Sequence, residues 1–401
     1  MLCSVQVWAG PRFQLLHAFA GPSSDGSYPA TPLLVGSNGN LLGATTFGGD
    51  SSTLCYPLGC GIVFELAPRN GHWNEALLYN FSPTATGSYP NPQGPLTLDA
   101  SGNIYGIETA GSGDSTCGCG AVFQLTRSEG AWTLNILHTY TGPSNDGSFP
   151  NSGLISDNAG NLYGATPNGG FDNSGTVFEL TPNVDGTWTY NIIYSFGSAR
   201  AGDGEEPSGP LTIDASGNLY GTTTAGGNFG EGTVYKLAPS GGAWTESILF
   251  NFSLDYGTQP NPTGVQIDSG GNLYGTTSYG GPYGLGTIYK LTPTIGLWNR
   301  TVLHSFTGGA DGAFPFGGIV FGPASNLYGA AYEGGTFGYG NVYEFSLVNG
   351  KWKQSILHQF TYGNDGSNPY VPLVINQLGN LYGAADQGGA YGFGTAFEIT
   401  Q

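Results

Sequence analysis

The hexapeptide "NLYGTT" stands at Asn218–Thr223 and again at Asn272–Thr277. Related copies are "NLYGAT" at Asn161–Thr166, "NLYGAA" at Asn326–Ala331 and Asn380–Ala385, "NLLGAT" at Asn40–Thr45 and "NIYGIE" at Asn103–Glu108. The first residues of the seven copies are separated by 63, 58, 57, 54, 54 and 54 positions. A near-constant period of this length indicates a tandem repeat of one supersecondary unit.

Each repeat contains four short segments that are typical of β-strands. In the fourth repeat they are "PLTID" (Pro210–Asp214), the hexapeptide itself, "GTVYKLAP" (Gly232–Pro239) and "WTESILFNF" (Trp244–Phe252). Gly, Pro and Asn clusters separate these β-branched and aromatic runs, which predicts an antiparallel meander. Within it, Gly-Asn is expected in the tight turn before the second strand, Leu and Tyr on opposite faces, and the following Gly where strands crowd.

Seven repeats of four strands predict an all-β fold, a seven-bladed β-propeller of four-stranded antiparallel blades. The chain opens with "FQLLHAF" (Phe13–Phe19), which matches the fourth segments, and finishes with "GTAFEITQ", which matches the third segments. We therefore predict one domain over residues 1–401, with residues 12–19 completing the last blade and closing the ring. A solenoid is the alternative architecture. A solenoid does not close on itself, so it would not need a strand from the N-terminus to complete its last repeat.

Composition narrows the classes of function. Gly 71 and Pro 25 disfavour long helices, and no run of about 18 apolar residues predicts a membrane-spanning helix. The formal net charge of −18 disfavours nucleic acid and anionic membranes as partners. Few charges and many small polar residues are typical of extracellular proteins. Met1–Gly10 lacks the basic start and apolar core of a signal peptide, so we expect a mature or trimmed N-terminus.

The repeated pattern "GNLYG…GG…GTVF" resembles the GloVer tandem-repeat family over nearly the whole chain. The resemblance implies a propeller fold and an exported protein. It implies little about chemistry, because the family has no agreed catalytic motif and a fold does not determine a function.

Four of the five cysteines lie in two equivalent loops, as Cys55, Cys60, Cys117 and Cys119. We expect disulfides that fasten these loops, rather than a thiolate metal site. Pairing within each loop and pairing between the loops are both open, and the strain of a Cys-x-Cys ring favours the second. Cys3 is left over.

The loops from each outer strand to the next inner strand end in Pro, and five contain Asp-Gly. These five Asp residues are Asp25, Asp146, Asp203, Asp311 and Asp365. Asp-Gly is a turn former, and calcium is the alternative interpretation. No other cofactor is predicted. The loop "SARAGDGEEP" differs most, because it gathers Arg200, Asp203, Glu205 and Glu206. It is either a solvated charged loop or an Arg–carboxylate subsite for a ligand.

Three acids break the repeat just after the hexapeptide, where the second strands end. Glu108 replaces a small Thr or Ala, and Asp386 and Glu333 occupy the next two positions in other blades. The ring places blades 2, 6 and 7 near one another, so the three are candidate catalytic residues at the channel mouth. Glycoside hydrolysis needs such a carboxylate pair, one as acid and one as nucleophile or base. Surface or structural acids are the plainer interpretation.

Aromatic side chains accompany these acids. Phe47, Tyr279 and Tyr332 follow second strands, and the neighbouring loops carry Tyr28, Tyr89, Phe149, Phe316 and Tyr370. They are candidates for stacking on sugar rings, or for packing the loops. His17, His138, His304 and His358 share one outer-strand position and are interpreted as repeated packing residues. No HExxH, GxSxG or P-loop motif is present.

The favoured hypothesis is a secreted propeller that binds a glycan or another extracellular ligand at the channel mouth. A glycoside hydrolase, or a polysaccharide lyase using Tyr with Arg200, is the second hypothesis. A structural scaffold in a surface assembly is the third. Ligand identity and oligomeric state do not follow from the sequence.

Overall fold

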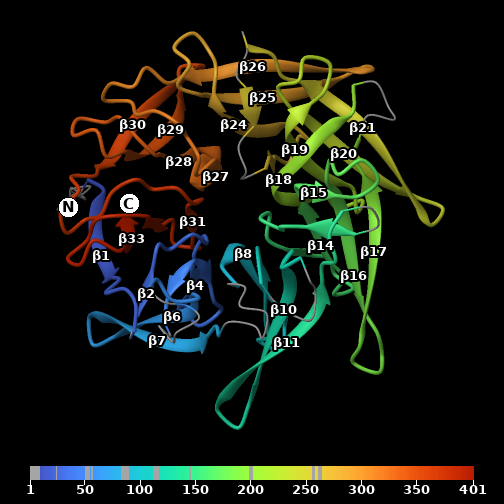
Figure 1. Cartoon of the computed structure of the whole chain (residues 1–401). Coiled ribbons are helices and arrows are strands. Elements are labelled where there is room, and N and C mark those ends of the chain that lie inside the picture. Colours follow the sequence, from blue (N-terminus) through green and yellow to red (C-terminus); the bar gives the residue numbers. More distant parts are fainter. Residues whose placement is uncertain are drawn as a thin grey trace, which may run out of the picture.

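The computed structural model describes residues 10–23, 25–49, 55, 57–82, 90–111, 117–143, 146–197, 202–254, 258–260 and 264–401. These residues form seven antiparallel sheets arranged around one axis, which confirms the predicted propeller (Figure 1). They contain no α-helix, and Pro323–Ser325 forms a short 3-10 helix, η2. None of the described residues belongs to a helix of the length and apolarity that crossing a bilayer requires.

Each blade has four strands, and in blades 1 to 6 they run in chain order from the axis outward. Blades 1 to 4 comprise β3 (Leu34–Val35), β4 (Leu41–Thr45), β6 (Ile62–Arg69) and β7 (His72–Asn80); β8 (Pro92–Leu98), β9 (Ile104–Glu108), β10 (Ala121–Ser128) and β11 (Ala131–Thr139); β13 (Ile155–Ser156), β14 (Leu162–Thr166), β16 (Thr176–Pro182) and β17 (Trp188–Ser195); and β18 (Gly204–Ile213), β19 (Leu219–Gly226), β20 (Thr233–Ser240) and β21 (Ala243–Asn251).

Blades 5 to 7 follow the same plan. Their strands are β23 (Gln266–Ile267), β24 (Leu273–Tyr279), β25 (Thr287–Thr294) and β26 (Leu297–Ser305); β27 (Ile319–Phe321), β28 (Leu327–Ala331), β29 (Asn341–Val348) and β30 (Lys351–Gln359); and β31 (Val374–Ile375), β32 (Leu381–Ala385), β33 (Thr395–Thr400) and β1 (Arg12–Ala18). Short extra strands pair in the loops: β2 (Gly26–Ser27) with β5 (Phe47–Gly48), β12 (Gly147–Ser148) with β15 (Asn168–Gly169), and β22 (Thr258–Pro260) with β24.

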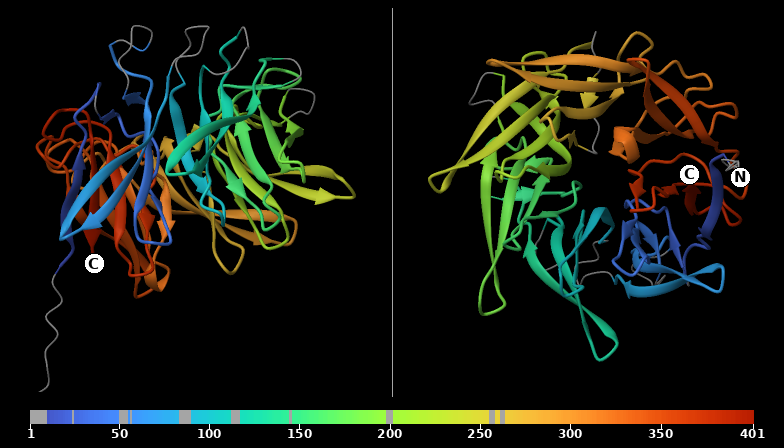
Figure 2. Two further views of the ribbon diagram at one scale, coloured as in Figure 1. Left: turned by 90° about the horizontal axis from the view of Figure 1, so that it is seen from below. Right: turned by 180° about the vertical axis from the view of Figure 1, so that it is seen from behind.

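The two ends of the chain share the last blade. β1 pairs antiparallel with β33 from Arg12 opposite Thr400 to Ala18 opposite Thr395. Figures 1 and 2 show this blue strand lying against the red strands beside the C-terminus. The predicted closing role of residues 12–19 is confirmed, and the closed ring leaves no blade without its outer strand.

The hexapeptide builds the seams between blades. At the seam of blades 3 and 4, Tyr163 of one blade packs with Leu219 and Trp244 of the next. The same trio recurs as Tyr105, Leu162 and Trp188; Tyr220, Leu273 and Trp298; Tyr274, Leu327 and Trp352; and Tyr382, Leu41 and Trp73. Leu and Tyr therefore point to opposite faces of each sheet, as predicted, and each joins a different neighbour.

The polar residues of the hexapeptide fasten the turn beneath it. Asp214 accepts hydrogen bonds from the backbone N–H groups of Ser216 (2.8 Å) and Asn218 (3.0 Å). It also accepts the Asn218 amide at 2.7 Å and the Tyr220 hydroxyl at 3.0 Å. The left-handed conformation belongs to Gly217, with φ of 79°, while Asn218 anchors the Asp. Asn lies in the turn, as predicted from the sequence. The hydrogen bond that its side chain donates to the Asp is the physical reason for Asn at this position.

The Gly of the hexapeptide is needed for close packing, as predicted. A Cβ on Gly221 would lie 2.4 Å from the Tyr235 hydroxyl oxygen, and one on Gly106 would lie 2.4 Å from the Phe123 ring. Each ring fills the space beside the neighbouring strand, so no larger residue fits there.

The seam packing predicts a large cost for truncating its Leu. Leu219→Ala leaves a cavity between two blades at a fully buried position, and we expect a loss of about 2–5 kcal/mol in the free energy of unfolding. Leu297→Ala, at a 71% exposed position that begins β26, is the matched control and should change stability by less than about 0.5 kcal/mol. Urea denaturation measures both, and equal losses would contradict this account of the seam.

Candidate functional site

The two loop families predicted to share one face are hydrogen-bonded to each other. The backbone N–H of Tyr332, just after β28, donates to the Phe314 carbonyl at 3.1 Å. The N–H of Asp386, just after β32, donates in the same way to the Asn368 carbonyl at 3.2 Å. The ends of the second strands and the loops that enter the inner strands therefore form one surface around the channel mouth.

Five aromatic residues gather on this surface over blades 5 to 7. We call Tyr279, Phe314, Phe316, Tyr332 and Tyr370 the aromatic cluster. Phe316 is its centre, with ring centroids 5.3 Å from Tyr332, 5.4 Å from Tyr370 and 6.1 Å from Tyr279. Tyr279 and Tyr370 are 40% and 43% exposed, so the cluster offers aromatic surface to solvent.

The aromatic cluster borders a cavity at the axis of the propeller. This cavity has a volume of about 340 Å³, and its lining residues come from blades 1, 2, 3, 4, 6 and 7. Phe316 and Tyr370 line one part of it, and Glu206 and Thr224 line another. Among the lining residues that the structure describes, Glu206 alone is charged, and its carboxylate accepts the Thr224 hydroxyl at 3.1 Å.

Asp386 and Glu333, two of the three predicted catalytic acids, lie near the aromatic cluster, where their charges act on Tyr332. Burial raises the pKa of Asp386 from 3.8 to about 6. Burial also raises the pKa of Tyr332, and the charges of Asp386 and Glu333 raise it further. Both acids are therefore neighbours of one phenol, and burial makes Asp386 hold its proton to higher pH than an exposed Asp does.

Glu108, the third predicted catalytic acid, lies elsewhere. It is 1% exposed in β9, opposite the small Ala121 of β10. Burial raises the pKa of Tyr79 in the outer strand of blade 1, and the charge of Glu108 raises it further. In blade 3 the same two strand positions hold Thr166 and Thr176, whose hydroxyls bond to each other. The Glu108 side chain, which is larger than Thr, is thus accommodated opposite the small Ala121. Glu108 lies near Tyr79 and not in the aromatic cluster.

The predicted ligand-binding residues are dispersed. Tyr279 and Tyr332 belong to the aromatic cluster and Glu206 to the cavity lining. Phe47 lies in blade 1 against Tyr28, with ring centroids 5.8 Å apart. Asp203 accepts hydrogen bonds from the Tyr194 hydroxyl and the Gly204 N–H, at 3.0 and 2.8 Å. Glu205 pairs across from Ala225 in β19, and Arg200 lies outside the described residues.

The Gloeobacter/Verrucomicrobia repeat matches three overlapping regions, residues 5–212, 110–320 and 207–401. The chain belongs to the Gloeobacter/Verrucomicrobia repeat family. The resemblance predicted from the hexapeptide is thereby confirmed. No curated protein matches the chain in sequence.

Two solved structures are similar to this family member at low sequence identity. A "putative 6-phosphogluconolactonase" of Bacteroides uniformis is 12% identical, with a TM-score of 0.53 over 84% of this chain and 86% of that one. A gluconolactonase of Xanthomonas campestris is 13% identical, with a TM-score of 0.46 over 97% of this chain and 89% of that one. At 12% identity the similarity to the first of these supports the fold alone.

Two disulfides close loops of blades 1 and 2 in this Gloeobacter/Verrucomicrobia repeat protein. Cys55 pairs with Cys60, and Cys117 with Cys119. The prediction of disulfides at these four residues is confirmed. Pairing occurs within each loop, and the cross-loop alternative that ring strain favoured is wrong. Cys3 lies outside the described residues.

The repeated histidines and the Asp-Gly loops, which sequence reasoning treated separately, form pairs. His17 and Asp25 lie 3.0 Å apart, His304 and Asp311 3.1 Å, and His358 and Asp365 3.1 Å. His138 pairs with Asp146 in the same way. A signal was available, since every outer strand with this His is followed by Asp-Gly seven or eight residues later.

The Asp of each pair also holds its own turn. Asp25 accepts the backbone N–H groups of Ala20 and Gly26 at 2.7 and 2.6 Å. Burial acts to raise the pKa of Asp25, but the hydrogen bonds from His17 and these N–H groups outweigh it and lower the pKa. These contacts agree with the turn interpretation of Asp-Gly.

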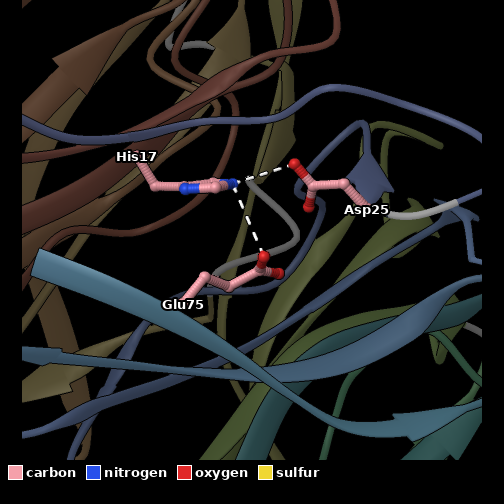
Figure 3. Close-up of side chains that lie close together, drawn as sticks. All are labelled: His17, Asp25 and Glu75. Atoms are coloured by element: carbon pink, nitrogen blue, oxygen red, sulfur yellow. Dashed lines mark hydrogen bonds and ion pairs between the residues drawn. The ribbon is translucent and has the colours of Figure 1, made fainter.

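Glu75 distinguishes the pair of His17 and Asp25 from the others (Figure 3). Burial lowers the pKa of His304 and of His358 despite their Asp partners. Burial also acts to lower the pKa of His17, but the carboxylates of Asp25 and Glu75 reverse the shift. Burial and the charge of Asp25 in turn raise the pKa of Glu75 to about 7.

Because the pKa of Asp386 is raised, we predict that Asp386→Asn increases the free energy of unfolding by an amount that depends on pH. The folded state binds this proton more tightly than the unfolded chain does, so the stabilisation is complete below about pH 4 and is lost as the pH rises through about 6. Above pH 6 the folded protein carries a poorly solvated charge. The variant should therefore gain stability relative to the wild type between pH 4 and pH 8, by at most about 3 kcal/mol before solvent screening.

Urea denaturation at pH 4 and pH 8 measures this gain. Glu333→Gln, at an exposed neighbour, is the matched control for removing a carboxylate from this surface. A gain for Asp386→Asn that is the same at both pH values would show that desolvation of its charge is not the cause.

Proposed function

We propose that this protein is an extracellular propeller that binds a glycan, with the aromatic cluster and the adjoining cavity as its binding site. The observation that carries the proposal is the position of Phe316 and Tyr370, which belong to both the cluster and the cavity wall. A ligand lying over the half-exposed Tyr370 ring therefore reaches the cavity without leaving aromatic surface.

The chemistry of this surface suits a sugar. The C–H groups on one face of a pyranose ring are weakly positive, and the face of an aromatic ring is negative, so the two stack. Glu206, Thr224 and Asn151 supply hydrogen-bonding groups at the cavity, where sugar hydroxyls need partners. An apolar wall with a few polar groups is the ordinary design of a site for a small uncharged ligand.

Electrostatics favours a neutral glycan over an acidic one. The chain carries a net charge of −18 and only nine Lys and Arg residues. Asp386, Glu333 and Glu206 add negative charge at the site itself. A uronate-rich or sulfated polymer would be repelled, whereas a neutral polymer would not. Two disulfides support an oxidising, extracellular location.

A glycan screen with matched aromatic variants tests this function. We expect binding to a neutral polysaccharide that Tyr370→Ala weakens by about 5-fold or more, because a stacked aromatic ring contributes about 1 kcal/mol. Tyr391→Ala, at a 62% exposed residue outside the cluster, should leave the affinity unchanged. Affinity electrophoresis against soluble polysaccharides measures both. The site is wrong if Tyr391→Ala weakens binding and Tyr370→Ala does not.

A glycoside hydrolase is the second candidate, and the raised pKa of Asp386 favours it. An acid with a pKa of about 6 retains its proton long enough to protonate a leaving group near neutral pH. Glu333, beside the same Tyr332, is the neighbouring carboxylate for the second role that the reaction needs. Reducing-end release from a bound polysaccharide, abolished in Asp386→Asn with binding retained, would support this candidate. Unchanged release in that variant would exclude Asp386 as its acid.

A further inference from the structure

In the outer strands, the residue two positions after the repeated Trp contacts the preceding blade. The contact lies at or beside the position that holds His17, His138, His304 and His358 in four of the blades. Phe13, at the equivalent position of β1, stacks on His358 with centroids 3.9 Å apart, and Tyr190 stacks on His138 at 3.6 Å. Gln354 donates a hydrogen bond to the backbone carbonyl of Asp311, beside His304, at 2.9 Å. At the seam of blades 7 and 1 the corresponding residue is Glu75, whose carboxylate lies 3.9 Å from His17 Nε2.

Three ligand atoms therefore converge at that one seam. His17 comes from β1, Asp25 from the loop entering blade 1, and Glu75 from β7, and Figure 3 shows their polar ends directed toward one another. One donor atom from each lies within 4.8 Å of the other two, and no other set of three His, Cys, Asp or Glu side chains in the described part of the chain does so. The Oε1 atom of Glu75 is buried and has no hydrogen-bond partner among the described residues.

We propose that His17, Asp25 and Glu75 bind one divalent transition-metal ion of the zinc class at the seam where the ring closes. Two ligands held at about 2.0–2.2 Å from a tetrahedral zinc ion lie about 3.3–3.6 Å apart. The separations of His17 Nε2 from the Asp25 and Glu75 oxygens, 3.0 and 3.9 Å, fall on either side of that value. Small side-chain movements bring all three donors to one ion.

The donor set favours zinc over calcium. Calcium takes six to eight oxygen ligands, whereas one imidazole with two carboxylates suits zinc and its first-row neighbours. Two carboxylates balance the charge of the ion, so the half-buried seam is left neutral. Three protein ligands leave a fourth position for water. Zinc binds neutral imidazole and ionised carboxylates, so its affinity for the trio should fall at low pH, where protons compete for the same atoms.

The ion would fasten the closing strand. β1 is held to its own blade by β33, and an ion bound by His17 and Glu75 would also tie it to β7 of blade 1. A ligand that binds only the folded ring stabilises it by mass action. Zinc binding should therefore raise the midpoint of thermal unfolding in proportion to the logarithm of the zinc concentration.

Two reciprocal substitutions test the site. Glu75→Gln gives this seam the side chain that blade 6 carries as Gln354, so the variant is expected to fold. Its zinc affinity should fall by more than about 100-fold. Loss of a residue that only orients a ligand typically lowers metal affinity by about 10–100-fold, so a larger fall indicates loss of a direct ligand. Gln354→Glu builds the same trio with His304 and Asp311, and the stoichiometry should rise from one zinc ion per chain to two.

Zinc chloride titrations of the oxidised protein, followed by calorimetry and by competition with a chromogenic chelator, give affinity and stoichiometry. His138→Gln removes a paired histidine at a seam without a third ligand, and it should leave zinc binding unchanged. The site is overturned if wild type and Glu75→Gln bind zinc equally, or if His138→Gln removes binding to the same extent. Saturation by calcium in place of zinc would overturn the proposed class of ion.

Discussion

The contact between a Tyr of one blade and the Leu and Trp of the next is the interaction on which the rest of the molecule depends. A four-stranded sheet is too small to bury its own apolar face, so each blade is stable only against its neighbours. At the seam of blades 4 and 5, for example, Tyr220 meets Leu273 and Trp298. Because the hexapeptide supplies both partners, one to each side, repetition of a single short stretch builds a continuous core around the ring.

A ring built this way must close, and its closure involves the two ends of the chain. β1 takes the outermost place in the blade that β31, β32 and β33 begin. Phe13 of this strand stacks on His358 of blade 6, so the closing strand also makes a seam contact. The histidine of β1, His17, faces the opposite neighbour, blade 1. The strand that closes the ring is thus shared between three blades, and substitutions in it affect more than one seam.

Five of the seven seams share the Tyr, Leu and Trp core, and the seams differ more at the outer-strand position beside it. The position two residues after the Trp holds Tyr190, Gln354, Arg300 or Glu75 in different blades, and each meets the neighbouring outer strand in its own way. Tyr190 stacks on a histidine, and the Arg300 guanidinium lies 5.7 Å from the Phe250 ring centroid. Since the core beneath is already packed, this position and the loops above it are where the protein can differ from blade to blade without losing its fold. The aromatic cluster, Asp386 and the trio around Glu75 all lie in these variable places.

The seven hexapeptides, their spacing and the offset ends determined the fold, because strand alternation, turn residues and a constant period are local and repeated. They also indicated which positions depart from the repeat, and Asp386, Glu333, Tyr279 and Tyr332 do lie near the channel mouth. What the sequence could not decide was which departures meet. Glu108 resembles Asp386 as an exception to the pattern, yet it faces Ala121 and Tyr79 inside the wall while Asp386 lies beside Tyr370. His17 and Asp25 form the same local pair as in three other blades, and only the packing of blade 1 against β1 adds Glu75 to it. Side-chain contacts across a seam join residues a whole repeat or more apart, and they depend on packing between sheets, which no spacing along one strand records.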